Sequence, residues 1–318
     1  VKETGGPEVL KYETVTVAEP GQGQVTVRHR AIGLNFVDIY FRSGVYPAPM
    51  PFVPGSEGAG VIEAVGPGVT EFKAGDRVAY AGGPMGAYAE VRTMPARYLV
   101  KIPGAIDDAT AAAAMLKGMT AQFLIHSAYK VKPGDTILVH AAAGGVGLIL
   151  SQWAKHLGAT VIGTVGSDEK AGLAAHNGCS HTINYSSEDF VARVKEITSG
   201  AGVPVVYDAV GQATFMKSLD CLRPLGMMVS FGQASGLVPP FSVNILAAKG
   251  SLYLTRPTLN TYAAKREDML AIANALFDVL AKGAVRCEVK QSFALADAAN
   301  AHRALAERRT TGSTVMIP

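Results

Sequence analysis

Residues 140–147 read HAAAGGVG and join two apolar runs, Ile137–Val139 and Leu148–Leu150. After His140, no side chain in this stretch is larger than valine. The three small positions of a G-x-G-x-x-G fingerprint are filled by Ala142, Gly144 and Gly147, with alanine in the first place. A short apolar run, a turn of small residues and a second apolar run predict a strand, a tight turn and a helix.

Such a turn is typical of a dinucleotide-binding site. Missing side chains let the backbone approach a pyrophosphate, and the N-terminus of the following helix offers free N–H groups and a positive dipole end. We therefore expect a pyrophosphate to lie over this turn, close to Gly144 and Gly147. The alternative is a turn in which the glycines only allow the helix to pack on the sheet.

The pattern around this turn predicts alternating strands and helices from residue 118 to 257. Apolar residues from Val146 to Leu157 recur at steps of three and four, and Gly158 marks the end of that helix. This alternation is typical of parallel βαβ units. The predicted strands are Thr136–His140, Thr160–Val165, Thr182–Asn184, Val203–Asp208, Met227–Phe231 and Ser251–Thr255.

The remaining segments have a different character. Residues 1–117 are rich in Gly and Pro and hold short β-type runs at 25–28, 60–65 and 77–80, which predict a β-dominated domain. The C-terminal part predicts two helices, near 269–280 and 296–308, and a closing strand at 313–317.

Composition limits the function. The 318 residues carry 29 basic and 26 acidic side chains without a dense run, so the charge does not favour nucleic acid. No apolar run reaches the roughly 18 residues of a membrane span. The charged first residues lack an apolar signal core, and three distant cysteines are typical of a reduced compartment, so we expect a cytoplasmic protein.

The end of the second predicted strand bears on the choice of nucleotide. NAD-binding proteins place a carboxylate there for the ribose hydroxyls, whereas this chain has Thr164–Ser167. Asp168 and Glu169 follow, but Ser167 is expected to cap a helix whose first turn holds both acids. With Lys170 in the same turn, the sequence favours NADPH over NADH.

The sequence gives no sign of a metal site. Residues 1–178 contain no cysteine, and Cys179 with His181 forms only a lone pair of potential ligands. The seven histidines show no metal-binding spacing and are expected to be surface or packed residues. No zinc site is therefore predicted.

Five motifs in order resemble the medium-chain dehydrogenase/reductase superfamily, and within it the zinc-free, zeta-crystallin-like NADPH:quinone oxidoreductases. They are GLNFVDIY at 33–40, PGSEGAG at 54–60, KAGDRV at 73–78, AAAGGVG at 141–147 and GSLYLTRP at 250–257. The resemblance implies a GroES-like β-rich domain (1–117 and 258–318) and a Rossmann domain (118–257). Ser56 stands where zinc-dependent members have a ligating histidine.

The resemblance also implies the residues that contact the nucleotide. Gly145 and Val146 would lie beneath the pyrophosphate. Asn35 would lie near the nicotinamide, and Phe123 stands where the family often has a tyrosine. Strand-end residues Phe231, Gly232, Gln233 and Ala234 would line the nicotinamide side. The adenosine 2′-phosphate would be held by Gly166, Ser167, Lys170, Tyr185 and Arg308. Alternatively, Lys170 and Arg308 are solvated charges and Asn35 only caps a turn.

For the substrate, Tyr40 and Tyr46 flank a short loop that opens on the nicotinamide in similar enzymes. Their rings could stack on a quinone, and a phenol could donate a hydrogen bond to its carbonyl, with Asn35 nearby. The alternative for both tyrosines is packing. Ser251–Thr255 is an uncharged candidate edge strand, which in similar proteins pairs with its twin in a homodimer.

The resemblance thus implies transfer of reducing equivalents from NADPH to a quinone. Two alternatives stay open. One is NADPH-dependent reduction of activated C=C bonds in enals or enones, which needs the same metal-free site. The other belongs to a different class, a crystallin-like or RNA-binding role, although no aromatic and basic stripe is present.

Overall fold

The computed structural model describes all residues, 1–318, and divides the chain into two compact units. Unit 1 comprises Val1–Met119, Ala263–Ala281 and Cys287–Pro318, and unit 2 comprises Thr120–Tyr262 and Lys282–Arg286. The boundary near residue 120 falls within α2 (Asp108–Phe123). No helix is both long and apolar enough to cross a bilayer.

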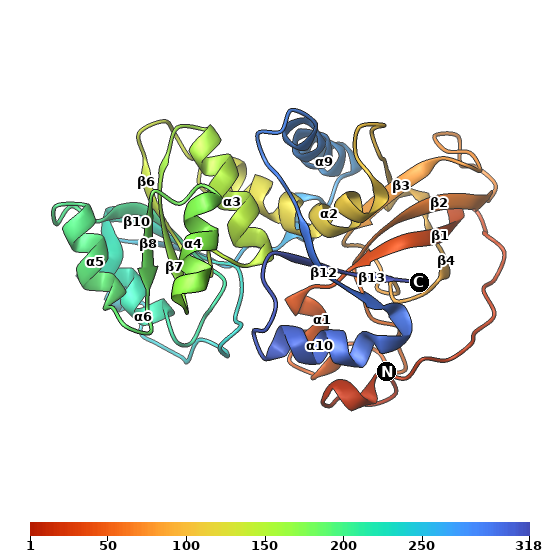
Figure 1. Cartoon of the computed structure of the whole chain (residues 1–318), viewed down its shortest axis with the longest axis horizontal. Coiled ribbons are helices and arrows are strands. Elements are labelled where there is room, and N and C mark those ends of the chain that lie inside the picture. The colour runs from red at the N-terminus through yellow and green to blue at the C-terminus, as the bar shows by residue number, and fades with distance from the viewer. The chain divides into compact units, whose positions relative to one another are not determined.

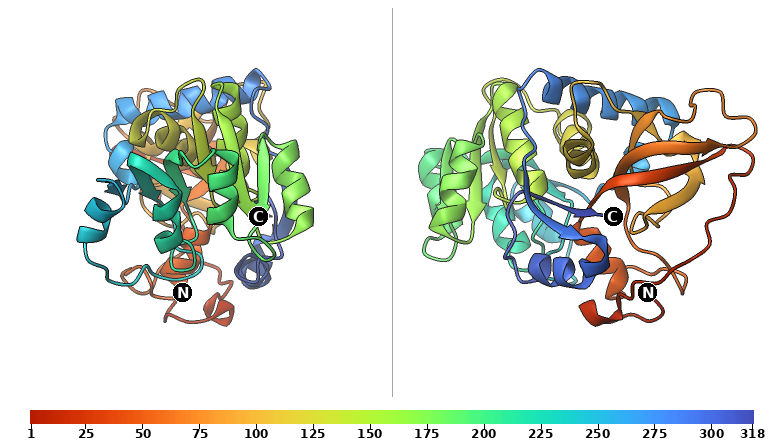
Figure 2. Two further views of the ribbon diagram at one scale, coloured as in Figure 1. Left: turned by 90° about the vertical axis from the view of Figure 1, so that its left-hand side faces the viewer. Right: turned by 45° about the vertical axis from the view of Figure 1, so that its right-hand side comes forward.

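Unit 1 is built on a seven-stranded sheet with the order β12-β13-β1-β2-β3-β5, and β4 also pairs with β1. Its C-terminal strands, blue in Figures 1 and 2, lie beside the N-terminal β1 because β13 pairs antiparallel with β1. The strands are β1 (Gln24–Gly33), β2 (Glu57–Val65), β3 (Arg77–Ala81), β4 (Val91–Pro95), β5 (Val100–Lys101), β12 (Val289–Ala294) and β13 (Ser313–Ile317).

The helices of unit 1 complete its core. Besides the first part of α2, they are α1 (Phe36–Arg42), α9 (Arg266–Ala281) and α10 (Ala298–Ala306). Inward side chains of β1 such as Val25, Val27 and Ile32 pack with Leu295 and Ala301 of the C-terminal segment. The last residues of the chain therefore help to bury the sheet begun by the first.

Unit 2 is a six-stranded sheet with the order β11-β10-β9-β6-β7-β8, in which every pairing is parallel. Its strands are β6 (Thr136–Val139), β7 (Thr160–Val165), β8 (His181–Asn184), β9 (Val203–Asp208), β10 (Leu222–Ser230) and β11 (Tyr253–Thr255). Its helices are α3 (Gly145–His156), α4 (Asp168–His176), α5 (Phe190–Ile197), α6 (Phe215–Ser218), α7 (Asn244–Ala248) and α8 (Leu259–Tyr262). Of these, α3, α4, α5 and α6 are labelled beside the sheet in Figure 1.

Several boundaries differ from the sequence predictions. β10 begins at Leu222, five residues early, because it pairs with Val203 before an irregularity at Leu225, which has a φ of 60°. β11 begins at Tyr253 rather than Ser251, since Ser251 has a φ of 55° and cannot continue a strand. Segments 258–262 and 282–286, assigned to the first domain, lie in unit 2.

Local contacts explain why those two segments belong to unit 2. The Tyr262 ring stacks on Phe123 at 4.6 Å between ring centres, with 13° between the planes. Arg286 N–H donates to the Gln152 amide oxygen on α3 at 2.9 Å, and Gln152 returns a hydrogen bond to Arg286 O. Sequence periodicity carries no information about either contact.

We expect Gly147→Ala to destabilise unit 2 by about 1–3 kcal/mol, because a Cβ there would lie 2.4 Å from the backbone oxygen of Ala141. Trp153, the single tryptophan, lies buried on α3, so its fluorescence during urea unfolding reports the change.

The matched control is Gly172→Ala on α4, where a Cβ meets nothing within 4 Å. This control should be neutral or stabilising by about 0.5–1 kcal/mol. Equal unfolding midpoints for the two variants would contradict the close helix–strand approach.

Candidate active site

The glycine turn of unit 2 follows β6 and leads into α3. Gly144 is the N-cap residue, and Ala142 N–H donates to Thr164 O of β7 at 3.0 Å, which holds the turn against the neighbouring strand. Gly147 has no room for a side chain, since its Cβ would also lie 2.8 Å from Ala142 Cα. The first N–H groups of α3 have no acceptor within the helix and are left for an anion.

His140, at the start of this turn, is a structural residue. It is fully buried, with Nδ1 2.7 Å from Thr164 Oγ1 and Nε2 2.8 Å from Ser218 Oγ. Ser218 donates its hydroxyl hydrogen to Thr214 O, so it accepts from His140 Nε2–H, and Nδ1 accepts from Thr164. Burial lowers the pKa of His140, consistent with this neutral ring.

The residues expected around a 2′-phosphate begin where β7 ends. Ser167 caps α4 and its hydroxyl accepts from Lys170 N–H at 3.3 Å. A Cβ on Gly166 would lie 2.7 Å from the Tyr185 hydroxyl, so a side chain at position 166 would shift the end of that tyrosine. Asp168 is turned to the Asn184 amide at 2.8 Å. The two acids near this end of β7, Asp168 and Glu169, thus lie in the first turn of α4 rather than on the strand.

A third segment of unit 2 follows β10. The N–H groups of Phe231 and Gly232 both donate to Asp208 O, and Ala234 N–H donates to Ala209 O. A Cβ on Gly232 would lie 2.5 Å from Ala209 O, which again requires glycine. Phe123 is buried and stacked on Tyr262. The carboxyl ends of parallel strands share one edge of a sheet, so the segments after β6, β7, β8 and β10 lie along that edge.

Unit 1 holds the other predicted residues. Tyr40 on α1 is 9% exposed and its ring lies 5.1 Å from that of Tyr46, which is only partly buried and also contacts Phe41. Asn35 is the N-cap of α1 and forms a capping box with Asp38. Arg308 is exposed just after α10, with a φ of 58°.

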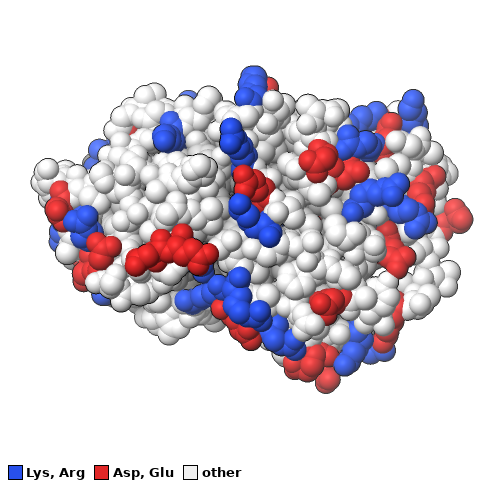
Figure 3. Space-filling model, in the orientation of Figure 1, with Lys and Arg blue, Asp and Glu red and all other residues white.

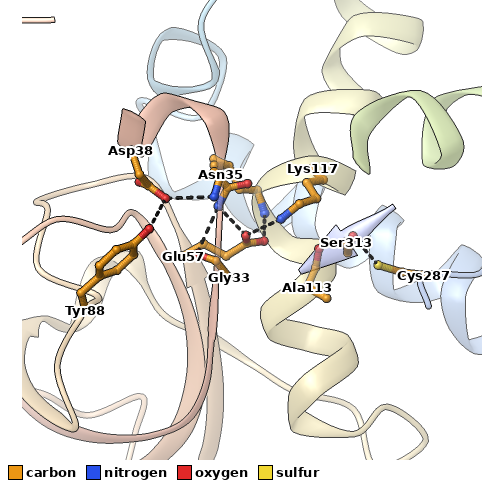
Figure 4. Close-up of polar contacts among 10 residues, drawn as sticks. Gly33, Asn35, Asp38, Glu57, Tyr88, Ala113, Lys117, Cys287 and Ser313 are labelled. Atoms are coloured by element: carbon orange, nitrogen blue, oxygen red, sulfur yellow. Dashed lines mark hydrogen bonds and ion pairs between the residues drawn. The ribbon is translucent and has the colours of Figure 1, made fainter. Parts of the chain in front are cut away.

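A buried polar network surrounds the start of α1 and was not predicted (Figure 4). Glu57 accepts from Asn35 Nδ2 at 2.7 Å, Lys117 Nζ at 3.0 Å and Leu116 N–H at 2.6 Å. The side chain of Glu57 is 0% exposed and that of Lys117 is 7% exposed. The only sequence signal was a charge within a glycine-rich or apolar stretch, PGSEGAG and AAAAMLKGM.

A second chain of hydrogen bonds ends on Asp38, which is fully buried. Its Oδ2 accepts from Asn35 N–H at 2.9 Å and from the Tyr88 hydroxyl at 3.0 Å. Tyr88 then accepts from His302 Nε2 at 2.8 Å, and His302 Nδ1 accepts from Arg42 Nη1 at 3.3 Å. Burial lowers the pKa of His302 to about 3, in keeping with the neutral ring that this order of donors requires.

The remaining Asp38 oxygen, Oδ1, is buried without a hydrogen-bond partner. Burial raises the pKa of Asp38 to about 7, although its hydrogen bonds from Asn35 and Tyr88 favour the ionised form. The carboxylate is thus costly in the folded state at neutral pH.

The three cysteines are unpaired and buried. Burial raises the pKa of Cys179, of Cys287 and, to about 12, of Cys221. No cluster of three or more His, Cys, Asp and Glu side chains has a geometry that could hold a metal ion.

Comparison with known proteins places this geometry in a family. Residues 21–104 match the alcohol dehydrogenase GroES-like domain and residues 145–273 match the zinc-binding dehydrogenase family. The chain is 56% identical to a quinone oxidoreductase of Pseudomonas aeruginosa over 99% of its own length and 97% of the relative's. The chain belongs to the quinone oxidoreductase family of medium-chain dehydrogenases/reductases.

One solved structure and one further relative are similar to this chain over its whole length. The structure of Escherichia coli quinone oxidoreductase complexed with NADPH is 48% identical, with a TM-score of 0.98, covering 100% of this chain and 98% of that one. A 2-haloacrylate reductase from Burkholderia sp is 49% identical over 100% of this chain and 98% of the relative. The predicted family and the pairing of a GroES-like with a Rossmann domain are confirmed.

The pH dependence of stability in unit 1 follows from Asp38. Its ordinary pKa is 3.8 and its pKa in the fold is about 7, so between these values the folded chain holds a proton that the unfolded chain releases. The free energy of unfolding therefore falls as the pH rises, and this group alone accounts for roughly 2–3 kcal/mol between about pH 5 and pH 8.

We expect Asp38→Asn to remove most of this pH dependence, because an amide does not titrate. The measurement is hydrogen exchange of β1 amides in increasing urea at both pH values, corrected for intrinsic exchange. Asp268→Asn, at an exposed position on α9, is the control and should keep the dependence of the unmodified protein. An unchanged dependence in Asp38→Asn would show that Asp38 is ionised throughout.

Proposed function

We propose that this chain transfers reducing equivalents from NADPH to a quinone without a metal ion. The observation that carries the proposal is the 56% identity with a quinone oxidoreductase over nearly the whole of both chains. The available side chains support a metal-free reaction. Position 56 is a serine rather than a zinc-binding histidine, and residues 1–178 contain no cysteine.

The residues present fit a dinucleotide. Gly147 and Gly232 each lie where a Cβ would collide with the backbone of a neighbouring segment, so the segments after β6 and β10 carry no side chain at these points and the backbone can approach a ligand. In unit 2 we assign Gly144–Gly147 to the pyrophosphate and Phe231–Ala234 to the nicotinamide side. The 2′-phosphate is assigned to Gly166, Ser167, Lys170 and Tyr185.

Unit 1 contributes further assignments. We assign Asn35 to the nicotinamide and Arg308 to the 2′-phosphate. Phe123 of unit 2 was also predicted to line the nucleotide site. Its ring stacks on Tyr262, so we assign it a packing role there and no hydrogen bond.

NADPH, when bound, supplies the hydride. The residues of the chain then have to hold the acceptor and stabilise the oxygen that gains charge. We assign this part to Tyr40 and Tyr46, whose rings offer a planar partner and whose hydroxyls can donate to a quinone carbonyl. Tyr46 is the more accessible of the two. Little acid–base catalysis is needed, because aromatisation favours quinone reduction and positioning supplies most of the rest.

Reduction of an activated C=C bond is the second candidate. The specific observation in its favour is the 49% identity with a 2-haloacrylate reductase over the whole chain. A conjugated acceptor of that kind needs the same hydride donor and the same hydrogen-bond donor.

A role in binding RNA is not supported. Basic and acidic side chains are interspersed on the face shown in Figure 3, and the net charge is only +3. We further propose a cytoplasmic location, which three buried, unpaired cysteines support.

The test of the function compares nucleotide oxidation with 1,4-benzoquinone and with a 2-enal, each with NADPH and NADH. We expect the quinone to be turned over faster than the enal, NADPH to be preferred, and a chelator to have no effect. Faster turnover of the enal would favour the second candidate, and loss of activity with the chelator would overturn the metal-free mechanism.

Lys170→Ala is expected to raise the Kd for NADPH about tenfold, because it removes a cation from the assigned 2′-phosphate position. The Kd for NADH, which lacks that phosphate, should change less than about twofold. Calorimetric titration measures both constants. Lys195→Ala on α5, an exposed lysine of the same unit, is the control. Equal losses for both nucleotides would contradict the assignment.

We propose a homodimer formed through β11. This strand lies at the edge of the sheet, and its side chains Tyr253 and Leu254 are 57% and 39% exposed. An uncharged edge with free backbone groups is a template for a second strand. Light scattering should give twice the mass of one chain, and Tyr253→Lys should reduce it to the monomer. A monomeric unmodified protein would remove the proposal.

A further inference from the structure

The carboxamide of Asn35 has both of its hydrogens in use. Nδ2 donates to Glu57 Oε2 at 2.7 Å and, more weakly, to Gly33 O at 3.4 Å (Figure 4). The side chain is only 6% exposed, so water does not compete for these contacts. Asn35 therefore has no N–H left with which to donate to a ligand.

Glu57 determines which way this amide faces. A carboxylate only accepts hydrogen bonds, so turning the amide would place its carbonyl oxygen 2.7 Å from Glu57 Oε2, with two acceptors in contact. The carboxylate itself cannot move away, because Lys117 Nζ and Leu116 N–H hold its two oxygens.

The surrounding backbone is shaped for this carboxylate. A Cβ on Gly33 would lie 2.0 Å from Glu57 Oε2 and 2.5 Å from Ala112 O. Any side chain at position 33 would therefore displace Glu57. Lys117, nearly as buried, supplies the compensating charge that a buried carboxylate requires.

What Asn35 can still offer is an acceptor. An amide oxygen has two lone pairs, and the capping box with Asp38 uses one of them. The second lone pair can receive an N–H or O–H hydrogen from a ligand. It cannot recognise a carbonyl oxygen, which has no hydrogen to give.

We propose that Glu57, held by Lys117, is a positioning residue that fixes the Asn35 amide as a pure hydrogen-bond acceptor for the carboxamide NH₂ group of the nicotinamide. This inference rests on the proposed function, since it assumes that NADPH is the nucleotide. It removes Asn35 from the groups that could donate to a quinone carbonyl and leaves that task to a tyrosine hydroxyl.

The test compares NADPH with its reduced 3-acetylpyridine analogue, in which a methyl group replaces the carboxamide NH₂. Calorimetry gives the Kd of each with the quinone absent, so the measurement is independent of turnover. The unmodified protein should bind NADPH about fivefold to tenfold more tightly than the analogue, the factor expected for one hydrogen bond between neutral groups.

Variants then identify the residues responsible. Asn35→Ala should bring the ratio of the two constants to about one. Glu57→Gln should do so as well, because a glutamine amide can accept or donate and no longer dictates the orientation of Asn35. Glu63→Gln, an exposed acid of the same strand β2 that pairs with Arg28, is the control and should keep the full ratio.

The outcomes separate the inference from the function on which it rests. A ratio near one in the unmodified protein, or a full ratio in Glu57→Gln, would overturn the inference while leaving NADPH binding intact. Failure of NADPH itself to bind would overturn the proposed function. Where Glu57→Gln does not fold, the ratio in the unmodified protein and in Asn35→Ala still decides the question.

Discussion

A buried carboxylate must be surrounded by hydrogen-bond donors, and in unit 1 this requirement falls on Glu57. Its three donors come from the segment before α1 and from α2, while Glu57 itself begins β2. Removing the Lys117 ammonium group would leave the Glu57 charge without compensation in the interior, at a cost of about 3–5 kcal/mol. The place where α1 begins, and with it the position of Asn35 and the two tyrosines, therefore depends on one ion pair and two hydrogen bonds.

In unit 2 the corresponding constraint is steric rather than electrostatic. Gly147 lies in the first turn of α3, Gly166 follows β7 and Gly232 follows β10, and each has a neighbouring atom where a Cβ would be. The acid nearest the end of β7, Asp168, lies in the first turn of α4 and accepts a hydrogen bond from the Asn184 amide, so the strand end itself carries no acid.

Local pattern was sufficient to predict β7, β9 and β13 to the residue and the turn before α3 to within one, because apolar periodicity and small residues act over short distances. It missed β12, whose burial alternates weakly, and it placed the start of β10 late because Leu225 interrupts the strand. The network around Glu57 could not be predicted. Lys117 is 60 positions away, and a single charged residue in an apolar stretch does not indicate which residue it pairs with. The contacts between the nucleotide and the assigned residues stay predictions.

The raised pKa values of Cys179, Cys221 and Cys287 bear on how the protein withstands its proposed substrate. Quinones are electrophiles that alkylate thiolates, and a catalyst that concentrates them near its own surface risks self-inactivation with every encounter. Because the thiolate is the reactive species, a thiol that stays protonated in the interior is a poor target. The chain thus keeps its three sulfur nucleophiles out of reach of the compound that it is proposed to reduce.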